Sequence, residues 1–346
     1  MAFVQRGNVV RIALVPLGES PNGVYRSIGP LMELQRRGHE ARRLDPRDAR
    51  GASALVRWCD VLHIHRHCDE GIVELARAAK ASGAAVVWDD DDDSLRPPKE
   101  FRQLVHGREA AMRLAARARL FELADLVTTT GPGLAEIFRS DGAREVQTIE
   151  NYVIDELAGD PRPRAGFEIG WPALREHELD LVHIPLVDAL RRLLDAHPHV
   201  RVTTIGIELR ALAGDRYSHL ESRSIQELMA RIASFDVGIA PLSPEVRMNH
   251  GRSNVKVKEY AVVGVPWLAS PIGPYAGLGE REGGRPVPDD RWFEELDALV
   301  RNTRQRRRLA KRATRWGRSQ LLSRNVERWE RAFVEAIERA RVPVAA

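Results

Sequence analysis

The chain has few of the residues that mark several large classes of protein. It holds only two cysteines among 346 residues, Cys59 and Cys68. Their spacing fits neither a disulfide framework nor a metal site, so we expect a reducing, cytoplasmic environment. Aromatic residues make up 6% of the chain and the formal net charge is +4. Nucleic-acid binders usually concentrate more positive charge and interleave it with aromatics, so no nucleic-acid partner is expected.

Long apolar runs are also missing, and no stretch of the sequence is long enough to span a bilayer. The run Ile12–Leu17 stops at Gly18 and is typical of a first strand, not of a signal peptide. With 43% apolar and 29% charged residues, 346 residues suffice for two ordinary α/β domains. A proline- and glycine-rich linker between them predicts domains over 1–155 and 165–320, with a last helix over 321–346.

The first part of the chain alternates strand and helix patterns. A strand over Val9–Leu17, a glycine-bearing loop that contains Gly23, a helix over Ile28–Arg37 and a strand over Glu40–Leu44 form a predicted β-loop-α-β unit. The G-x-G fingerprint of dinucleotide enzymes is missing from that loop, so no NAD site is expected.

The most informative stretch is FDVGIAPLSPEVRMNHGRSNVKVKEYAVVGVPWLAS, residues 235–270. Two apolar runs, Val237–Leu242 and Val265–Ala269, flank a single predicted helix. Ser253 is expected to cap the start of this helix, and Gly264 to end it. A helix that starts after a long polar loop in this arrangement points its N-terminus at the carboxyl edge of a parallel sheet.

Lys256 and Glu259 lie three residues apart and therefore on one face of that helix. A cation in the first turn, beside free backbone N–H groups, suits a diphosphate. A carboxylate one turn further along suits the paired hydroxyls of a ribose. The alternative is an ordinary solvated Lys–Glu pair. Lysine is scarce in the chain, with only five residues, and two of them, Lys256 and Lys258, fall in this helix.

This block resembles the donor-binding segment of GT-B glycosyltransferases, in particular the large GT4-like group. The residues that match are Arg252, Ser253, Lys256, Glu259, Gly264 and Pro266. The resemblance implies that Arg252, Ser253 and Lys256 bind the diphosphate and that Glu259 binds the ribose. Many retaining members carry a second Glu eight residues before the ribose Glu, where this chain has Gly251. Whether transfer would retain or invert the anomeric centre therefore stays open.

Two other loops extend the resemblance. Gly170, His177 and Asp180 resemble a glycine–histidine–aspartate loop of some GT4-like enzymes, which implies a place near the donor phosphates and a catalytic role for His177. A helix-capping turn at His177–Asp180 is the alternative. The opening β-loop-α-β unit is similar to that of the GT-B N-terminal domain, which adds Gly23 to the candidate donor-binding residues.

Five consecutive acids, Asp89 to Asp93, follow a predicted strand over Ala84–Trp88. The carboxyl end of such a strand is where α/β folds place chemistry. We interpret Asp90, Asp91 and Asp92 as candidate catalytic residues at an acceptor site. A divalent-metal site and a solvated acidic loop are the alternatives. GT-B enzymes generally need no metal for transfer, so no metal ligands and no cofactor are assigned.

Two further patterns carry weaker predictions. His63, His65 and His67 alternate along the sequence, which would put them on one face of a strand end. One or two histidines at the sheet edge and one in the loop are favoured over a metal site. Beyond residue 300, nine basic residues lie within an eighteen-residue helical segment, Arg301–Arg318. This segment is either a solvated arginine-rich face or a contact with an anionic membrane.

The sequence thus predicts an α/β GT-B fold, with two Rossmann-like domains that face a cleft and a C-terminal helix that packs back on the first domain. The predicted activity is transfer of a sugar from a nucleotide-diphosphate sugar to an unidentified acceptor. A hydrolysing nucleotide-sugar epimerase of the same fold and a catalytically degenerate partner protein are the alternatives.

Overall fold

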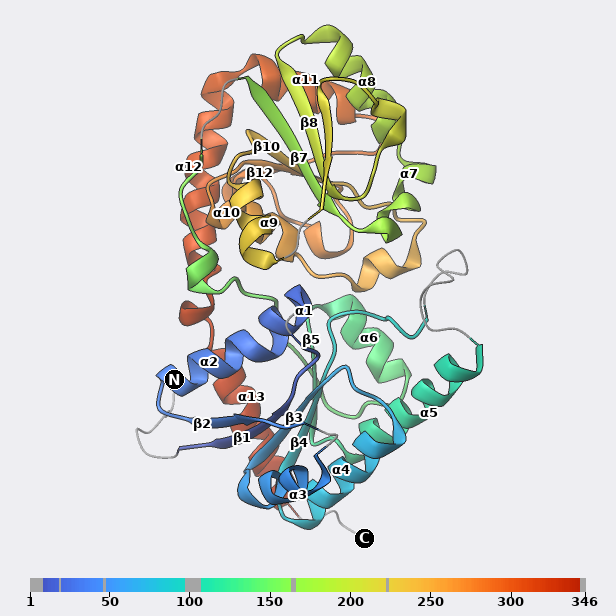
Figure 1. Cartoon of the computed structure of the whole chain (residues 1–346), viewed down its shortest axis with the longest axis vertical. Helices are drawn as coiled ribbons and strands as arrows, with labels where there is room; N and C mark the ends of the chain where they lie inside the picture. Colours follow the sequence, from blue (N-terminus) through green and yellow to red (C-terminus); the bar gives the residue numbers. More distant parts are fainter. Residues whose placement is uncertain are drawn as a thin grey trace. The chain divides into compact units, whose positions relative to one another are not determined.

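The computed structural model describes residues 9–18, 20–45, 48–96, 107–162, 166–221 and 224–342. The chain divides into two compact units (Figure 1). Unit 1 comprises residues 1–150 and 325–346, and unit 2 comprises residues 151–324. Each unit contains one six-stranded parallel sheet with helices packed against it. No helix in the described part of the chain has the length and apolar character needed to cross a membrane.

The sheet of unit 1 has the strand order β2-β1-β3-β4-β5-β6. Its strands are β1 (Arg11–Val15), β2 (Glu40–Arg43), β3 (Val61–His65), β4 (Ala85–Asp89), β5 (Leu126–Thr129) and β6 (Val146–Thr148). Its helical segments are α1 (Pro21–Gly23), the π-turn η1 (Val24–Ile28), α2 (Gly29–Arg36), α3 (Ala49–Trp58), α4 (Glu70–Ala81), α5 (Gly107–Leu123), α6 (Pro132–Ser140) and α13 (Glu327–Arg341). β3 and β4 are buried over their whole length, as expected of central strands in a parallel sheet.

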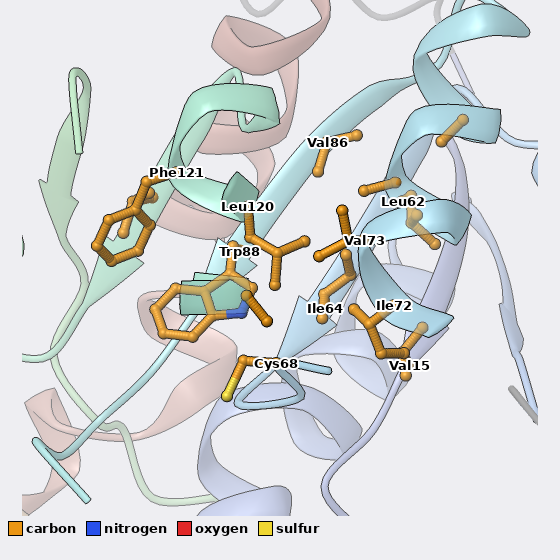
Figure 2. Packing of buried hydrophobic residues seen from close by; sticks show 14 of the residues in the cluster. Val15, Leu62, Ile64, Cys68, Ile72, Val73, Val86, Trp88, Leu120 and Phe121 are labelled. Atoms are coloured by element: carbon orange, nitrogen blue, oxygen red, sulfur yellow. The ribbon is translucent and has the colours of Figure 1, made fainter. Parts of the chain in front are cut away.

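Alternation along β3 sends neighbouring side chains to opposite faces of this sheet. Leu62 and Ile64 join the cluster under α4 and α5 that Figure 2 shows, where Trp88 meets the ring of Phe121 edge-on at 5.2 Å. His63 faces the other way and packs against Trp329 of α13 at 5.3 Å between ring centroids. The last helix therefore packs on the sheet of unit 1, which confirms that prediction.

The sheet of unit 2 has the strand order β12-β11-β10-β7-β8-β9. Its strands are β7 (Phe167–Ala173), β8 (Val200–Gly206), β9 (Tyr217–Leu220), β10 (Val237–Ala240), β11 (Trp267–Ala269) and β12 (Gly284–Pro286). Its α-helices are α7 (Asp180–His183), α8 (Leu186–Ala196), α9 (Ile225–Ile232), α10 (Val255–Val262), α11 (Trp292–Arg301) and α12 (Thr303–Ser319). Its 3-10 turns are η2 (Asp155–Leu157), η3 (Arg175–Glu178), η4 (Arg210–Leu212), η5 (Arg247–Gly251), η6 (Gly273–Tyr275), η7 (Glu280–Glu282) and η8 (Leu322–Arg324).

Helix α10 ends as its sequence predicts. Gly264 has φ = +73°, its N–H bonds to the carbonyl of Ala261 at 3.0 Å, and the N–H of Val265 bonds to Tyr260 at 2.9 Å. This is a Schellman ending, in which the left-handed residue is usually glycine. Helix α12 lies directly against α10, because a Cβ on Gly317 would stand 2.5 Å from the carbonyl of Ala261.

Several predicted boundaries were wrong. Residue 254, not Ser253, occupies the N-cap position of α10. The sequence of Leu181–Ala196 predicts a single helix, but Pro185 divides it into α7 and α8, because proline has no backbone N–H to continue the first helix. The sequence of Glu208–Ala213 also predicts a helix, but only the short turn η4 forms there. A long helix is predicted over Glu100–Ala124; its start lies outside the described residues, which show it from residue 107.

Two errors affect candidate site residues. The predicted glycine-bearing loop is already helical from Pro21, with the side chain of Ser20 accepting a hydrogen bond from Gly23 at 3.3 Å. The sequence predicts a short strand over Phe167–Ile169 with the Gly170 loop after it, but the strand continues to Ala173 as β7. Gly170 therefore lies inside a strand and not in a loop.

Candidate functional site

The sheet of unit 2 reverses its strand order between β7 and β10. In open α/β sheets, ligands bind outside the carboxyl ends of the strands at such a switch point. Two segments, residues 174–180 and 241–256, leave these strands and carry five of the candidate residues: His177, Asp180, Arg252, Ser253 and Lys256. A sixth, Glu259, follows one turn into α10. Their positions follow from the topology of the sheet.

His177 and Asp180 form a buried pair. The imidazole Nδ1 of His177 lies 2.7 Å from a carboxylate oxygen of Asp180, and both side chains are less than 5% exposed. Burial, and then the nearby charge of Arg252, lowers the pKa of His177 to about 4, so the ring is neutral at pH 7. A neutral ring that bonds a carboxylate through Nδ1–H presents Nε2 as an acceptor.

Asp180 also holds the loop that follows β10. Its other oxygen accepts hydrogen bonds from the backbone N–H of Ser243 at 2.8 Å and from the amide of Asn249 at 2.6 Å. Asn249 in turn accepts a bond from the guanidinium of Arg252 at 3.0 Å. Burial alone would raise the pKa of Asp180, but its interactions with His177, Ser243 and Asn249 together outweigh burial and keep the pKa below its usual range. The predicted capping turn at this position is thus a link between two loops.

Arg252 lies at the open side of this network. Its side chain is 16% exposed, and one guanidinium nitrogen stands 3.7 Å from Glu176, whose side chain is 26% exposed. This contact is long and partly solvated, so an anion with better geometry can replace Glu176 at a modest cost.

Lys256 lies in the first turn of α10, where backbone N–H groups lack partners within the helix. Its ammonium group donates a hydrogen bond to the carbonyl of Pro172, near the end of β7. Burial lowers the pKa of Lys256 to about 8, with Glu259 opposing this shift and Arg252 adding to it. A desolvated cation at a helix N-terminus attracts an anion more strongly than a solvated one does.

Glu259 is 6% exposed and lies one turn further along the same helix. Its charge acts on Lys256 and also on Tyr275, a buried residue of η6. Burial raises the pKa of Tyr275 well above its usual range, so its hydroxyl keeps its proton. The same phenol feels the charges of Arg252 and Asp180, which places Tyr275 within this cluster.

Ser253 and Lys258 have contacts that set them apart from this cluster. The hydroxyl of Ser253 accepts a bond from the amide of Asn151 at 3.2 Å. Lys258 is fully buried, donates to the carbonyl of Asn151 at 2.9 Å and stands 4.4 Å from the ring centroid of Tyr152. Of the two lysines in α10, Lys256 therefore belongs to the site and Lys258 anchors the segment that leads into unit 2.

Two candidate glycines are explained by packing within the protein. A Cβ on Gly170 would stand 2.0 Å from the ring of Phe235, and one on Gly23 would stand 1.9 Å from the carbonyl of Gly18. Both positions exclude a side chain because the protein itself fills the space. The geometry of neither glycine points to a ligand.

The acids of unit 1 follow β4, at the carboxyl edge of the other sheet. Asp89 is fully buried and bonds the guanidinium of Arg26, whose Nε lies 3.0 Å away, and the hydroxyl of Thr128 at 2.6 Å. Burial alone would raise the pKa of Asp89, but Arg26 keeps it below its usual range. Arg26 comes from η1, and π-turns of this kind occur often at functional sites.

Asp90 and Asp91 share a different arginine. The guanidinium of Arg66 lies 2.7 Å from Asp90 and 2.6 Å from Asp91. Burial raises the pKa of Asp90 to about 7, with Asp91 and Asp92 adding to the shift that Arg66 opposes. In Asp91 burial is outweighed by Arg66, His65 and Arg26 acting together, and the pKa falls below its usual range. The acids thus divide into an ionised member and one that titrates near neutrality.

Asp92 differs from its neighbours, because its side chain is only partly buried and its carboxylate caps the backbone N–H of Asp93 at 2.9 Å. In the described part of the chain, no group of three or more His, Cys, Asp or Glu residues is arranged to hold a metal ion. Arg26 and Arg66 supply the positive charge that the clustered carboxylates need.

The three alternating histidines do not form one row. His63 and His65 belong to β3, but Arg66 has φ = +63° and turns the chain away before His67. His65 lies 3.3 Å from the hydroxyl of Ser27 and 3.5 Å from Asp91, whereas His67 bonds the carbonyl of Pro16 at 3.0 Å. His67 thus lies in the loop after β3, which confirms the favoured interpretation of one histidine in a loop.

Sequence reasoning missed four residues that organise the two sites: Arg26, Arg66, Asn249 and Tyr275. A glycine–proline pair at 273–274 marks the turn that carries Tyr275. Gly273 has φ = +52°, and a Cβ there would meet the carbonyl of Asn249 at 2.6 Å. The arginines gave no comparable signal, because arginine is common throughout the chain.

The fold of the whole chain is similar to that of several solved structures. The HepE protein of Anabaena in complex with UDP and glucose matches with a TM-score of 0.62 and 15% identity, over 96% of this chain and 100% of that one. Sucrose-phosphate synthase from Thermosynechococcus elongatus matches with a TM-score of 0.66 and 11% identity, over 95% and 99%. A glycosyltransferase from Rickettsia africae matches with a TM-score of 0.66 and 13% identity, over 96% and 100%.

The chain has the GT-B fold. Its two six-stranded parallel sheets, each with interspersed helices, match those of these two-domain α/β structures. No family model and no curated protein matches the sequence. At identities of 11–15% the likeness extends to the fold, and the roles of individual residues must be argued from their geometry.

Proposed function

We propose that this protein is a glycosyltransferase that moves a hexose or a related sugar from a nucleotide-diphosphate sugar to a hydroxyl of an acceptor. The observation that carries the proposal is the cluster at the switch point of unit 2. There Lys256, at the N-terminus of α10, interacts electrostatically with the partly exposed Arg252 and with the buried carboxylate of Glu259. HepE, which has the same fold, was crystallised with UDP and with UDP-glucose, which supports a nucleotide-sugar donor here.

On the donor side, Lys256, Arg252 and the first turn of α10 would bind the diphosphate, with Ser253 at its edge. These groups stabilise the charge that develops on the leaving diphosphate as its bond to the sugar breaks. The neutral His177, oriented by Asp180, would accept a hydrogen bond from a sugar hydroxyl through Nε2. Glu259 would accept hydrogen bonds from the two ribose hydroxyls.

Replacing Glu259 by glutamine tests this assignment directly. The substitution keeps the shape of the side chain but removes its charge and turns a hydrogen-bond donor toward the ribose hydroxyls. Hydrogen bonds to a charged group contribute about 1.5–3 kcal/mol, so binding of a nucleoside diphosphate should fall about tenfold or more. Isothermal titration calorimetry with UDP, GDP, ADP, CDP and TDP would identify the base and measure the loss.

The matched ligand control is the 2′,3′-dideoxynucleotide of the same base. It should bind the parent protein poorly and should barely distinguish the parent from Glu259→Gln. An equal loss for both ligands would show that Glu259 does not bind the ribose, and the assignment of α10 as the donor helix would fail with it.

On the acceptor side, we assign the proton-accepting role to Asp90. Its pKa of about 7 suits a general base, whereas Asp91 stays ionised and holds Arg66 in place. Asp90 would take the proton of the acceptor hydroxyl as its oxygen forms the new bond to the anomeric carbon. The electron pair of the broken bond then leaves with the diphosphate. Asp92 would bind acceptor hydroxyls. This scheme needs no metal and no other cofactor.

The Asp90→Asn variant should bind the donor nucleotide normally but transfer sugar about a hundredfold more slowly or worse, since general base catalysis typically contributes this much. In the parent protein, kcat/KM should rise as the pH increases through about 7, because the base must be ionised. The variant should lack that rise. Unchanged transfer by Asp90→Asn, or activity that EDTA abolishes and magnesium restores, would contradict the scheme. Conversion of the donor sugar without any acceptor would instead identify an epimerase.

A further inference from the structure

Positive charge in this chain is concentrated in one helix. The segment Arg301–Arg318 contains nine basic residues and no acid. The rest of the chain, with 44 basic and 49 acidic residues, therefore carries a formal net charge of −5 although the whole chain carries +4. Most of this segment is α12, which Figure 1 shows as one long helix of unit 2. The modest net charge of the chain hides this concentration.

The packing of α12 puts most of its basic residues on the face that is exposed to solvent. Leu309, Ala313 and Gly317 are the buried residues of α12, and they form the face that packs toward α10. At 100° per residue, the cations at 304, 307, 308, 311, 315 and 318 fall within an arc of about 100° on the opposite face. All six are exposed. The helix thus presents an uninterrupted basic stripe about 21 Å long to solvent.

Most of the stripe has no counter-ion among the residues that the structure describes. Arg308 pairs with Glu280 at 3.2 Å. The other five form no ion pair with any of the described residues, and we call them the α12 stripe: Arg304, Arg307, Lys311, Arg315 and Arg318. The flanking bases are engaged instead, since Arg312 pairs with Glu280 and Arg306 lies 4.7 Å over the ring of Phe167. Apart from Arg306, the cations of α12 that form no ion pair with the described residues therefore lie along one line of the helix.

We propose that the α12 stripe holds the protein on a membrane surface rich in anionic lipid. Each Lys or Arg near such a surface favours binding, and a straight row of long side chains can reach a flat layer of head groups together. Nucleic-acid surfaces usually interleave aromatic and amide side chains among the cations. At 100° per residue, the amide of Gln305 and the ring of Trp316 fall outside the arc of the cations, so neither interrupts the stripe. This inference stands on α12 alone and does not depend on the proposed function.

The test compares two variants with the same loss of three charges. In the stripe variant, Arg307, Lys311 and Arg315 become glutamine. In the control variant, Arg77, Arg113 and Arg191 become glutamine, and these exposed arginines each pair with a carboxylate of their own helix. Vesicles of phosphatidylcholine, with or without about one third phosphatidylglycerol, serve as probes in a flotation assay at low and high salt.

The parent and the control variant should bind the anionic vesicles, not the neutral ones, and should be released by salt. The stripe variant should bind about a hundredfold more weakly, because each charge near the surface is worth about fivefold. Equal weakening in both variants would mean that the effect is one of total charge and would overturn the proposal. So would failure of the parent to bind anionic vesicles, or tighter binding of the parent to duplex DNA at the same phosphate concentration.

Discussion

Replacing Lys256 by methionine should weaken binding of a nucleoside diphosphate by about 1.5–3 kcal/mol, or roughly ten- to a hundredfold. Methionine keeps most of the side-chain volume but removes a cation that burial has already stripped of solvent at the start of α10. The loss should be smaller for the corresponding monophosphate, which lacks the terminal phosphate. Calorimetry with both nucleotides measures the difference.

The pH dependence of binding gives a second measure. The pKa of Lys256 in the free protein is about 8, so the ammonium form that attracts the diphosphate is present below pH 8 and is lost above it. Affinity for the diphosphate should therefore decline from pH 7 to pH 9 in the parent protein. It should stay nearly constant in the methionine variant. A variant that loses equal affinity for mono- and diphosphate, or keeps the parent's pH profile, would show that Lys256 does not contact the terminal phosphate.

The contrast between Lys256 and Lys258 shows how far sequence alone can reach. Helical spacing put Lys256 on one face with Glu259, and the structure places both at the switch point of unit 2. Spacing could not reveal that Lys258 is fully buried and bonds the carbonyl of Asn151, more than a hundred residues earlier. Local patterns predict which face of a helix a residue occupies, but tertiary contacts decide what covers that face.

The acids of unit 1 illustrate the same limit. Their place after a buried strand was readable, because parallel strands end at a common edge. Their ionisation could not be predicted from the sequence, because it depends on two distant arginines. Arg26, from the segment after β1, pairs with Asp89. Arg66, from the segment after β3, pairs with Asp90 and Asp91. Arg66 also adopts a left-handed backbone conformation that is uncommon outside glycine. In a chain so rich in arginine, no local signal distinguishes these two from the rest.

The pair formed by Arg26 and Asp89 carries the largest expected effect on stability. Both side chains are fully buried, and Arg26 also bonds the carbonyl of Ile149 and lies 4.7 Å over the ring of Trp329 in α13. Replacing Arg26 by methionine would leave the Asp89 carboxylate without its counter-ion in a dry site. Removing one partner of a buried ion pair typically costs about 3–5 kcal/mol, and we expect a loss of this size in the free energy of unfolding.

Urea denaturation followed by tryptophan fluorescence would measure this loss, with Arg11→Met as the control for an exposed ion pair. Arg11 bonds Asp60 at 2.7 Å, but its side chain is 44% exposed, so its loss should matter far less. Combining Arg26→Met with Asp89→Asn should recover part of the stability, because the uncompensated charge is then gone.

Acid provides the last check. In the parent protein Arg26 holds the pKa of Asp89 below the unfolded value, so Asp89 contributes stability above about pH 4 that is lost as the pH falls further. Without Arg26, burial would raise that pKa, and protonation would relieve the orphaned charge. The difference in unfolding free energy between parent and Arg26→Met should therefore shrink between pH 7 and pH 4. A difference that is independent of pH, or losses that simply add in the double variant, would mean that packing against Trp329 and not the buried charge accounts for the role of Arg26.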